Sequence, residues 1–290
     1  MQFEMEAQNR QLNFLLTTAL AVVLGLVAAA LGLLPWNILA QLNVRWWPNA
    51  PWCAPIGLLW LFLFWSYLNG AGWPASTAES RNKLLRALPL HGNRLRWSVF
   101  AGASGLIALV TLYFVAVQFV DLQPSAFRPR SVAALPFGVV VVAMFMSAVV
   151  AGVVEEAAYR GYMQGILERR FRASVAIAIV TIVFTSVHLF GGSKILPLAI
   201  PVCATSIVLG ALTIITQSVL PATVVHVLGD ATTLPVEWGL VGKLPVGRFY
   251  TNGLDAAFAG SVLVLLLAWA ATIAALLKLR AIARHTQTET

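Results

Sequence analysis

The chain contains repeated runs of about twenty consecutive apolar residues, which begin at Phe14 and continue to Leu279. A helix needs about 20 such residues to cross the hydrocarbon core of a bilayer. Charged residues make up only 10% of the 290 residues and the mean hydropathy is +0.83, whereas a soluble domain is about 25% charged. These values exclude a water-soluble fold and predict one all-α membrane domain, residues 1–290, folded as a polytopic helical bundle.

Prolines, glycines, asparagines and charges divide the apolar runs into about eight transmembrane helices. The seventh is the least regular, because Pro221, Gly229 and Pro235 crowd a short stretch, and a broken or partial helix is an alternative there. The apolar run Phe14–Leu34 is longer than the 7–15 residues of a signal-peptide core, so we expect the first helix to be retained. The predicted spans are residues 13–34, 52–72, 97–120, 133–154, 173–190, 195–217, 219–233 and 254–278.

Basic residues are divided unevenly between the loops. With eight spans, and with Lys278 at the end of the last span counted with the C-terminus, thirteen of the nineteen Lys and Arg residues lie at the two termini and in the second, fourth and sixth loops. Cytoplasmic loops are enriched in these residues, so we expect both termini to be cytoplasmic, in a bacterial plasma membrane. The net charge of +8 then indicates anionic lipid head groups as partners and no nucleic acid. Residues 73–96, where arginines alternate with leucines, suit an interfacial amphipathic stretch or a simple positive-inside loop.

A few ionisable residues lie within or against the predicted spans. Each costs at least about 2.5–3.5 kcal/mol at a helix centre, so each requires a partner or a function. The candidates fall in three separate segments: Glu155 with Glu156, His188, and His226 with Asp230.

The first segment reads Glu155-Glu156-Ala157-Ala158-Tyr159-Arg160. Residues 156 and 160 lie about 40° apart on a helix, which favours an ion pair between Glu156 and Arg160. Glu155 then points elsewhere and is available as a base, because a carboxylate held by arginine is a poor proton acceptor. The alternative is a helix that ends at the interface with two solvated acids.

The other two segments each place a ring and a polar group one turn apart. Phe184 precedes His188 by four residues, and His226 precedes Asp230 by four. A single histidine of this kind is often only a satisfied core residue. The His226–Asp230 pair could bind a metal, orient a tautomer or neutralise a buried charge. Together, the three segments in a chain so poor in intramembrane charge predict one shared functional site.

The three segments, in this order, resemble the CPBP or Abi family of intramembrane proteases, which includes the endopeptidase that trims CAAX-type prenylated proteins. The family pattern is Glu-Glu-x-x-x-Arg, then Phe-x-x-x-His, then His-x-x-x-Asn or Asp. The resemblance covers about residues 133–235, which are therefore the predicted catalytic core helices. It implies an intramembrane protease that acts on a membrane-embedded or lipidated peptide.

The resemblance also implies roles for individual residues. Glu155 and His188 would activate a water molecule, Glu156, Arg160 and Phe184 would support the site, and His226 and Asp230 would line the side where the oxyanion forms. The best-characterised family members carry Asn at the position of Asp230, and an ionised carboxylate cannot donate to an oxyanion. Asp230 is therefore protonated, orients His226 or helps to bind a cation.

Two further questions remain open at the level of sequence. The expected mechanism needs no cofactor, but a zinc ion held by His188, His226 and Glu155 is an alternative. A proton-coupled transporter or a catalytically inactive scaffold could use the same buried cluster. Charge counting places Glu155 at the cytoplasmic end of one helix, whereas simple alternation places His188 toward the opposite side. A shared site therefore requires a short or tilted fifth helix, or burial well below the cytoplasmic surface.

Overall fold

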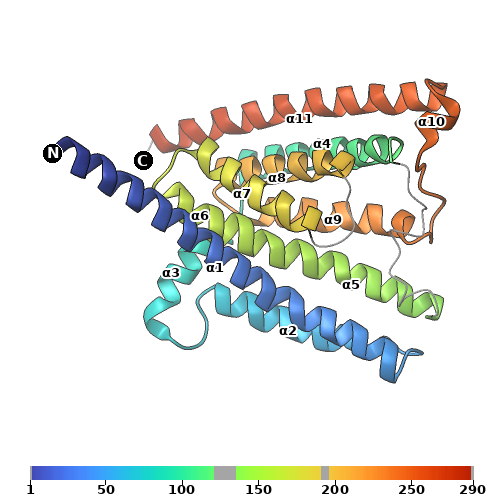
Figure 1. The fold of residues 1–290 in the computed structure, drawn as a ribbon, viewed down its shortest axis with the longest axis horizontal. Helices are drawn as coiled ribbons and strands as arrows, with labels where there is room; N and C mark the ends of the chain where they lie inside the picture. Colours follow the sequence, from blue (N-terminus) through green and yellow to red (C-terminus); the bar gives the residue numbers. More distant parts are fainter. Residues whose placement is uncertain (1, 121–134, 191–195, 289–290) are drawn as a thin grey trace.

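A computed structural model describes the backbone of residues 2–120, 135–190 and 196–288, and the side chains of residues 12–120, 135–189 and 198–284. These parts of the chain are helical and contain no strand. The long helices pack side by side as a bundle, and the first turns of α1 and the last turns of α11 lie at the same end (Figure 1). The predicted all-α membrane bundle is confirmed.

The helices have the following bounds, in chain order: α1 (Gln2–Trp46), α2 (Cys53–Leu68), the 3₁₀ turn η1 (Ala75–Thr77), α3 (Ala78–Leu85), α4 (Gly92–Val117), α5 (Phe137–Glu155), the π-helical η4 (Glu156–Met163), α6 (Gln164–Glu168), α7 (Ala173–Phe190), α8 (Leu196–Thr216), α9 (Leu220–Glu237), α10 (Arg248–Asn252) and α11 (Ala256–Thr288).

Five helical segments are long and apolar enough to cross a membrane: Leu12–Trp46, Gly92–Val117, Phe137–Glu168, Leu198–Thr216 and Ala256–Arg284. Two shorter apolar helices, Cys53–Leu68 and Ala173–Leu189, pack among them. The count of eight membrane crossings stays a prediction. Residues 133, 134 and 195, where two of the predicted spans begin, lie outside the described part of the chain.

The helix that carries Glu155 does not end there, and the predicted end at residue 154 is wrong. α5 continues without a break through η4 and α6, so that residues 137–168 form one helical segment of 32 residues. Glu155 therefore lies in the interior of a span, and Arg160 is part of a helix rather than of a loop. The π-helical turn starts directly after Glu155, and such turns occur frequently at functional sites.

This continuation removes the conflict over depth. From Glu155 to the end of α6 at Glu168 are 13 residues, about 20 Å at 1.5 Å per residue. From the start of α7 at Ala173 to His188 are 15 residues, about 22 Å. A short turn joins the two helices, so both side chains lie at the same depth inside the bundle.

α9 is one continuous helix that extends to Glu237, so the alternative of a broken seventh helix is wrong. Pro221 stands in its first turn, where a backbone N–H has no partner within the helix, and a proline is tolerated there. α9 packs closely on α5 at Gly152, where a Cβ atom would lie 2.8 Å from the backbone nitrogen of Val227. Because Gly152 has no side chain, the backbone of Val227, directly after His226, can approach the turn of α5 that precedes Glu155.

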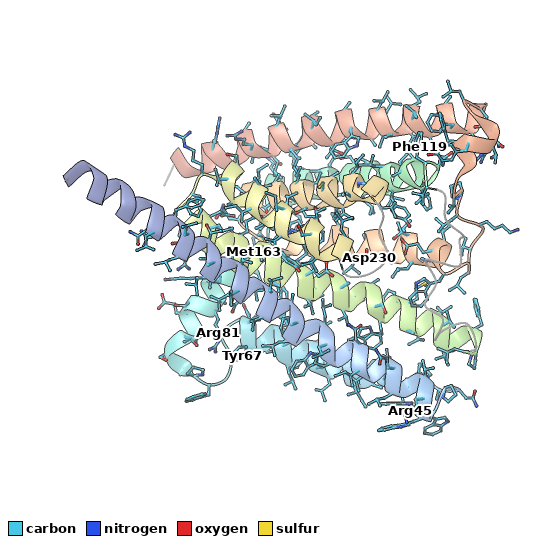
Figure 2. The ribbon with its side chains drawn as sticks, viewed as in Figure 1. Arg45, Tyr67, Arg81, Phe119, Met163 and Asp230 are labelled. Atoms are coloured by element: carbon cyan, nitrogen blue, oxygen red, sulfur yellow. The ribbon has the colours of Figure 1, made fainter. Side chains whose placement is uncertain are left out.

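The loop after α2 is held by a buried arginine. Arg81 is 5% exposed, and its guanidinium donates to the carbonyl oxygens of Tyr67, Ala71, Gly72 and Pro74. It also lies 4.2 Å from the centre of the Tyr67 ring, and Figure 2 shows the two residues beside each other. The interfacial interpretation of residues 73–96 therefore does not hold for Arg81.

Candidate active site

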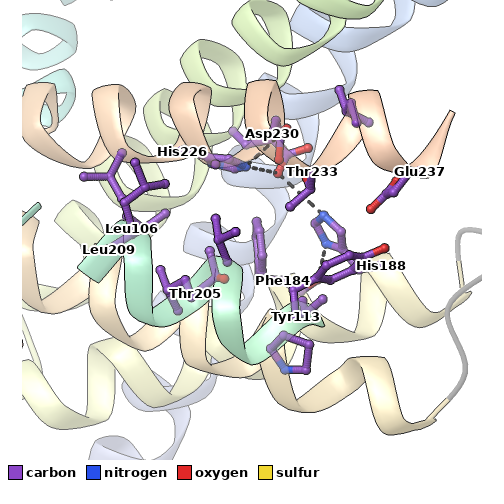
Figure 3. A pocket seen from close by; sticks show the side chains of 18 residues that line it. Leu106, Tyr113, Phe184, His188, Thr205, Leu209, His226, Asp230, Thr233 and Glu237 are labelled. Atoms are coloured by element: carbon purple, nitrogen blue, oxygen red, sulfur yellow. Dashed lines mark hydrogen bonds and ion pairs between the residues drawn. The ribbon is translucent and has the colours of Figure 1, made fainter. Parts of the chain in front are cut away.

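Glu155 lies between two imidazole rings in the interior of the bundle. Its Oε2 atom is 3.7 Å from Nε2 of His188 and 3.9 Å from Nε2 of His226. The three residues come from α5, α7 and α9, and Figure 3 labels the two histidines among the residues that line the adjoining pocket. Side chains that are 71 residues apart in the chain thus meet around one carboxylate, as the shared-site hypothesis requires.

Glu156 joins an arginine to the second histidine. Its Oε1 atom accepts from Arg160 at 2.9 Å, in a pair with both side chains fully buried, and from Nδ1 of His226 at 2.8 Å. The expected Glu156–Arg160 ion pair is confirmed. Glu155 does not point elsewhere, however, because the two neighbouring glutamates contact opposite nitrogens of the same His226 ring.

These contacts indicate the tautomers of the two histidines. Nδ1 of His188 lies 2.8 Å from the carbonyl oxygen of Phe184, which can only accept, so this nitrogen carries hydrogen. Nδ1 of His226 likewise donates to the Glu156 carboxylate. In the neutral rings, both Nε2 atoms therefore carry the lone pair, and both lie within 4 Å of Oε2 of Glu155.

Phe184 is the packing centre of the site and is 2% exposed. Its ring centre lies 4.2 Å from that of His188 and 4.4 Å from the guanidinium carbon of Arg160. The Tyr159 ring meets it edge-on at 5.1 Å. One aromatic side chain thus contacts both the Glu-Glu-x-x-x-Arg segment and the histidine of α7.

Asp230 lies one turn after His226 on α9. Its Oδ2 atom is 3.8 Å from Nε2 of His226, and its side chain is 33% exposed. Nε2 of His226 therefore has carboxylates from two helices near it, Glu155 on α5 and Asp230 on its own helix.

A cavity of about 190 Å³ adjoins the cluster and is lined by residues of α4, α5, α7, α8 and α9. Four polar lining residues were not singled out in the sequence: Tyr113, Thr205, Thr233 and Glu237. Glu237 lies seven residues after Asp230, a spacing that returns to the same helical face. It was missed because the predicted helix ended at residue 233. Tyr113 lies within an apolar run and gave no signal of its own.

The zinc alternative depends on the spacing of the atoms around Glu155. In the described residues, no group of three or more His, Cys, Asp and Glu side chains has the geometry to hold a metal ion. A tetrahedral zinc site places neighbouring ligand atoms roughly 3.3–3.6 Å apart. Glu155 lies 3.7 and 3.9 Å from the two histidine nitrogens. A zinc ion held by His188, His226 and Glu155 therefore stays an alternative, which inhibition by a chelator would distinguish from the glutamate mechanism.

Comparison with protein families supports the resemblance seen in the motifs. Residues 136–232 match the family model described as "Rce1-like: Type II CAAX prenyl endopeptidase Rce1-like". Comparisons with curated proteins and with solved structures give no match. The matched region begins at α5 and ends within α9, so it contains every side chain of the cluster around Glu155. Within residues 136–232, this integral membrane protein is thus similar to the CAAX-type endopeptidases that the family model describes.

Proposed function

We propose that this protein is an intramembrane endopeptidase that hydrolyses a peptide bond of a membrane-embedded or lipidated peptide, with a water molecule activated by Glu155 and His188. The observation that carries the proposal is the meeting of Glu155 with two imidazole Nε2 atoms, 3.7 and 3.9 Å away, beside a cavity inside the bundle. The match of residues 136–232 to a family of CAAX prenyl endopeptidases supports it.

In the proposed mechanism, a water molecule lies beside both Glu155 and His188. The distance between Glu155 and His188 exceeds a direct hydrogen bond, which measures about 2.7–3.2 Å. A water beside both groups would donate one hydrogen to the carboxylate and one to the Nε2 lone pair of His188. Its own lone pair would then point away from both and toward a substrate carbonyl. Glu155 accepts the proton as the water attacks, and returns it to the leaving amine when the C–N bond breaks.

His226 is the candidate donor to the developing oxyanion. Its Nδ1–H is held by Glu156, so in the imidazolium form its Nε2–H faces the space beside Glu155 and Asp230. A donor fixed before the reaction stabilises the oxyanion without reorganisation. In this arrangement Asp230 positions the ring of His226, so it does not itself need to donate. A carboxylate can therefore stand at the position where the resemblance implies an amide.

The proposal is tested with protein reconstituted in lipid vesicles and a panel of prenylated and unmodified transmembrane peptides. Cleavage is followed by mass spectrometry for wild type, Glu155→Gln, His188→Ala and His226→Ala. We expect losses of about 10²–10⁴-fold for Glu155→Gln, which keeps the shape of the side chain and removes the base. Glu79→Gln, at a fully exposed site, is the matched control and keeps wild-type activity.

Two results would overturn parts of the proposal. Cleavage by a folded Glu155→Gln protein at the wild-type rate would remove Glu155 from the chemistry. Cleavage that stops with a chelator and returns with zinc would replace the glutamate mechanism by a metal mechanism. Activity that persists in the chelator supports the mechanism proposed here.

A further inference from the structure

α9 carries a polar stripe that extends well beyond the catalytic cluster. His226, Asp230, Thr233 and Glu237 are separated by four, three and four residues, so they lie within about 60° of one another on the helix. All four line the same cavity. A polar face of this length is costly inside a membrane, and only its first two members are used by the proposed chemistry.

The stripe has the length of a short peptide. From His226 to Glu237 are 11 residues of helix, about 16 Å along its axis. An extended chain advances roughly 3.3–3.6 Å per residue, so about five substrate residues could lie along this face. If the scissile bond lies at Glu155, a substrate residue several positions away from that bond would lie at Glu237.

A second helix completes the far end of the cavity. The Tyr113 side chain of α4 is 8% exposed and lines the cavity together with Glu237. Its hydroxyl lies close enough to the Glu237 carboxylate to donate to it, and Figure 3 labels both residues among those that line the pocket. A phenol that donates to Glu237 still offers the lone pairs of its oxygen, so both side chains can accept from an N–H group of a ligand.

The formal charges of the cavity favour a cation. Its described lining includes three acidic residues, Glu155, Asp230 and Glu237, and neither lysine nor arginine. The two histidines both lie at the catalytic end, around Glu155. A positively charged ligand group would find a carboxylate acceptor in Glu237 and a hydroxyl in Tyr113.

We propose that Tyr113 and Glu237 form a substrate subsite that binds a positively charged nitrogen of the peptide, roughly three to five residues from the scissile bond. The nitrogen belongs to a lysine or arginine side chain or to a free terminal amine. The subsite determines specificity and takes no part in the bond cleavage. It rests on the proposed endopeptidase function and adds the chemical class of residue that the enzyme prefers.

The first test measures selectivity with matched peptides. Each carries lysine or its uncharged analogue norleucine at one position between two and six residues from the cleavage site, with a free or acetylated amino terminus. We expect wild type to favour lysine at one position by about 10- to 100-fold in kcat/KM, the worth of a hydrogen bond to a charged group. Dependence on acetylation, and not on lysine, identifies the terminal amine as the ligand.

Variants connect the preference to the two residues. Glu237→Gln should lower the lysine-to-norleucine ratio at least tenfold, and Glu237→Lys should reverse it toward a peptide with glutamate at that position. Tyr113→Phe, which removes only the hydroxyl, should lower the ratio by a smaller factor. Thr232→Ala, at an exposed position of the same helix, is the control and should keep the wild-type ratio. An unchanged ratio in Glu237→Gln would overturn the subsite.

A binding measurement tests the subsite independently of the proposed protease function. Fluorescently labelled lysine and norleucine peptides are titrated onto the Glu155→Gln protein, and the Kd ratio is compared with that of the Glu155→Gln, Glu237→Gln double variant. Equal affinities for both peptides overturn the subsite even if wild type is a protease. A Kd ratio that depends on Glu237, in a protein whose wild type cleaves no peptide, supports the subsite and rejects the protease.

Discussion

Nδ1 of His226 lies 2.8 Å from Oε1 of Glu156, the same oxygen that accepts from Arg160. One buried carboxylate therefore connects α9 to the helix that carries Glu155. Because the Glu156 and Arg160 side chains are fully buried, removal of either leaves an uncompensated charge.

We expect Glu156→Ala to destabilise the protein by about 3–5 kcal/mol, the usual cost of breaking a buried ion pair, and to abolish activity. The measurement is thermal unfolding in detergent together with peptide cleavage. The exposed pair Glu79–Lys83 has the same spacing of four residues, so Glu79→Ala is the control and should leave the midpoint unchanged. Equal effects of the two substitutions would contradict the connecting role of Glu156.

Gly152 permits the close packing of α5 on α9. A Cβ atom there would lie 2.5 Å from Cγ2 and 2.8 Å from the backbone nitrogen of Val227. Gly152→Ala should therefore cost about 1–3 kcal/mol by overpacking. It should also move Glu155 away from His226, and a misplacement of 1 Å can cost about 100-fold in rate.

Gly138 on the same helix has no atom within 4 Å of the corresponding position. Gly138→Ala should keep full activity and gain up to about 1 kcal/mol in helix stability. Retained activity in Gly152→Ala would show that the separation of α5 and α9 is not critical for the site.

Phe184 supports the site through the face and edges of its ring. Phe184→Leu removes a buried contact with the Arg160 guanidinium, at 4.4 Å, which is worth about 2 kcal/mol when desolvated. It also leaves the His188 ring without its stacking partner, so kcat should fall. Phe62→Leu is the control, because Phe62 is 66% exposed on the outside of the bundle. A Phe62→Leu protein as impaired as Phe184→Leu would contradict this role.

Substitutions of Asp230 test how this residue contributes to stabilising the oxyanion. Asp230→Asn keeps the shape and can still pair with His226 or donate by itself, so activity should stay within about tenfold of wild type. Asp230→Leu removes both possibilities and should cost about 100-fold or more. Steady-state cleavage rates of the two variants decide between them. An Asn variant as inactive as the Leu variant would mean that the negative charge itself is required.

The orientation in the membrane is tested by labelling. The termini and the turn between α6 and α7 are expected on the cytoplasmic side. In a background without native cysteines, an impermeant thiol reagent added to intact cells should label Thr251→Cys, in α10, and not Ser80→Cys in α3. Both positions are exposed. The opposite pattern of labelling would invert the topology.

Several features were predictable because they depend on local properties of the chain. The bundle follows from apolar runs with a length that matches the bilayer. The Glu156–Arg160 pair follows from a spacing of four residues within one helix. The candidate residues stood out because intramembrane charge is rare, although sequence alone could place them only on separate segments.

The continuation of the helix past Glu155 depends on partners that a local pattern does not contain. Two consecutive glutamates interrupt an apolar run, and hydropathy therefore predicts an end at residue 154. In the folded chain, Arg160 and His226 compensate Glu156, and the helix extends to Glu168. Contacts between helices outweigh the local cost of burying the charge.

By itself, the sequence determined a membrane-embedded helical protein and the residues with the chemistry for hydrolysis, because hydropathy and residue type are properties of single positions. Tertiary structure alone decided that Glu155 and His188 share one depth, that both glutamates contact His226, and that Tyr113 and Glu237 extend the cavity. These relations depend on how far each helix continues and on which faces meet, and packing between distant segments sets both.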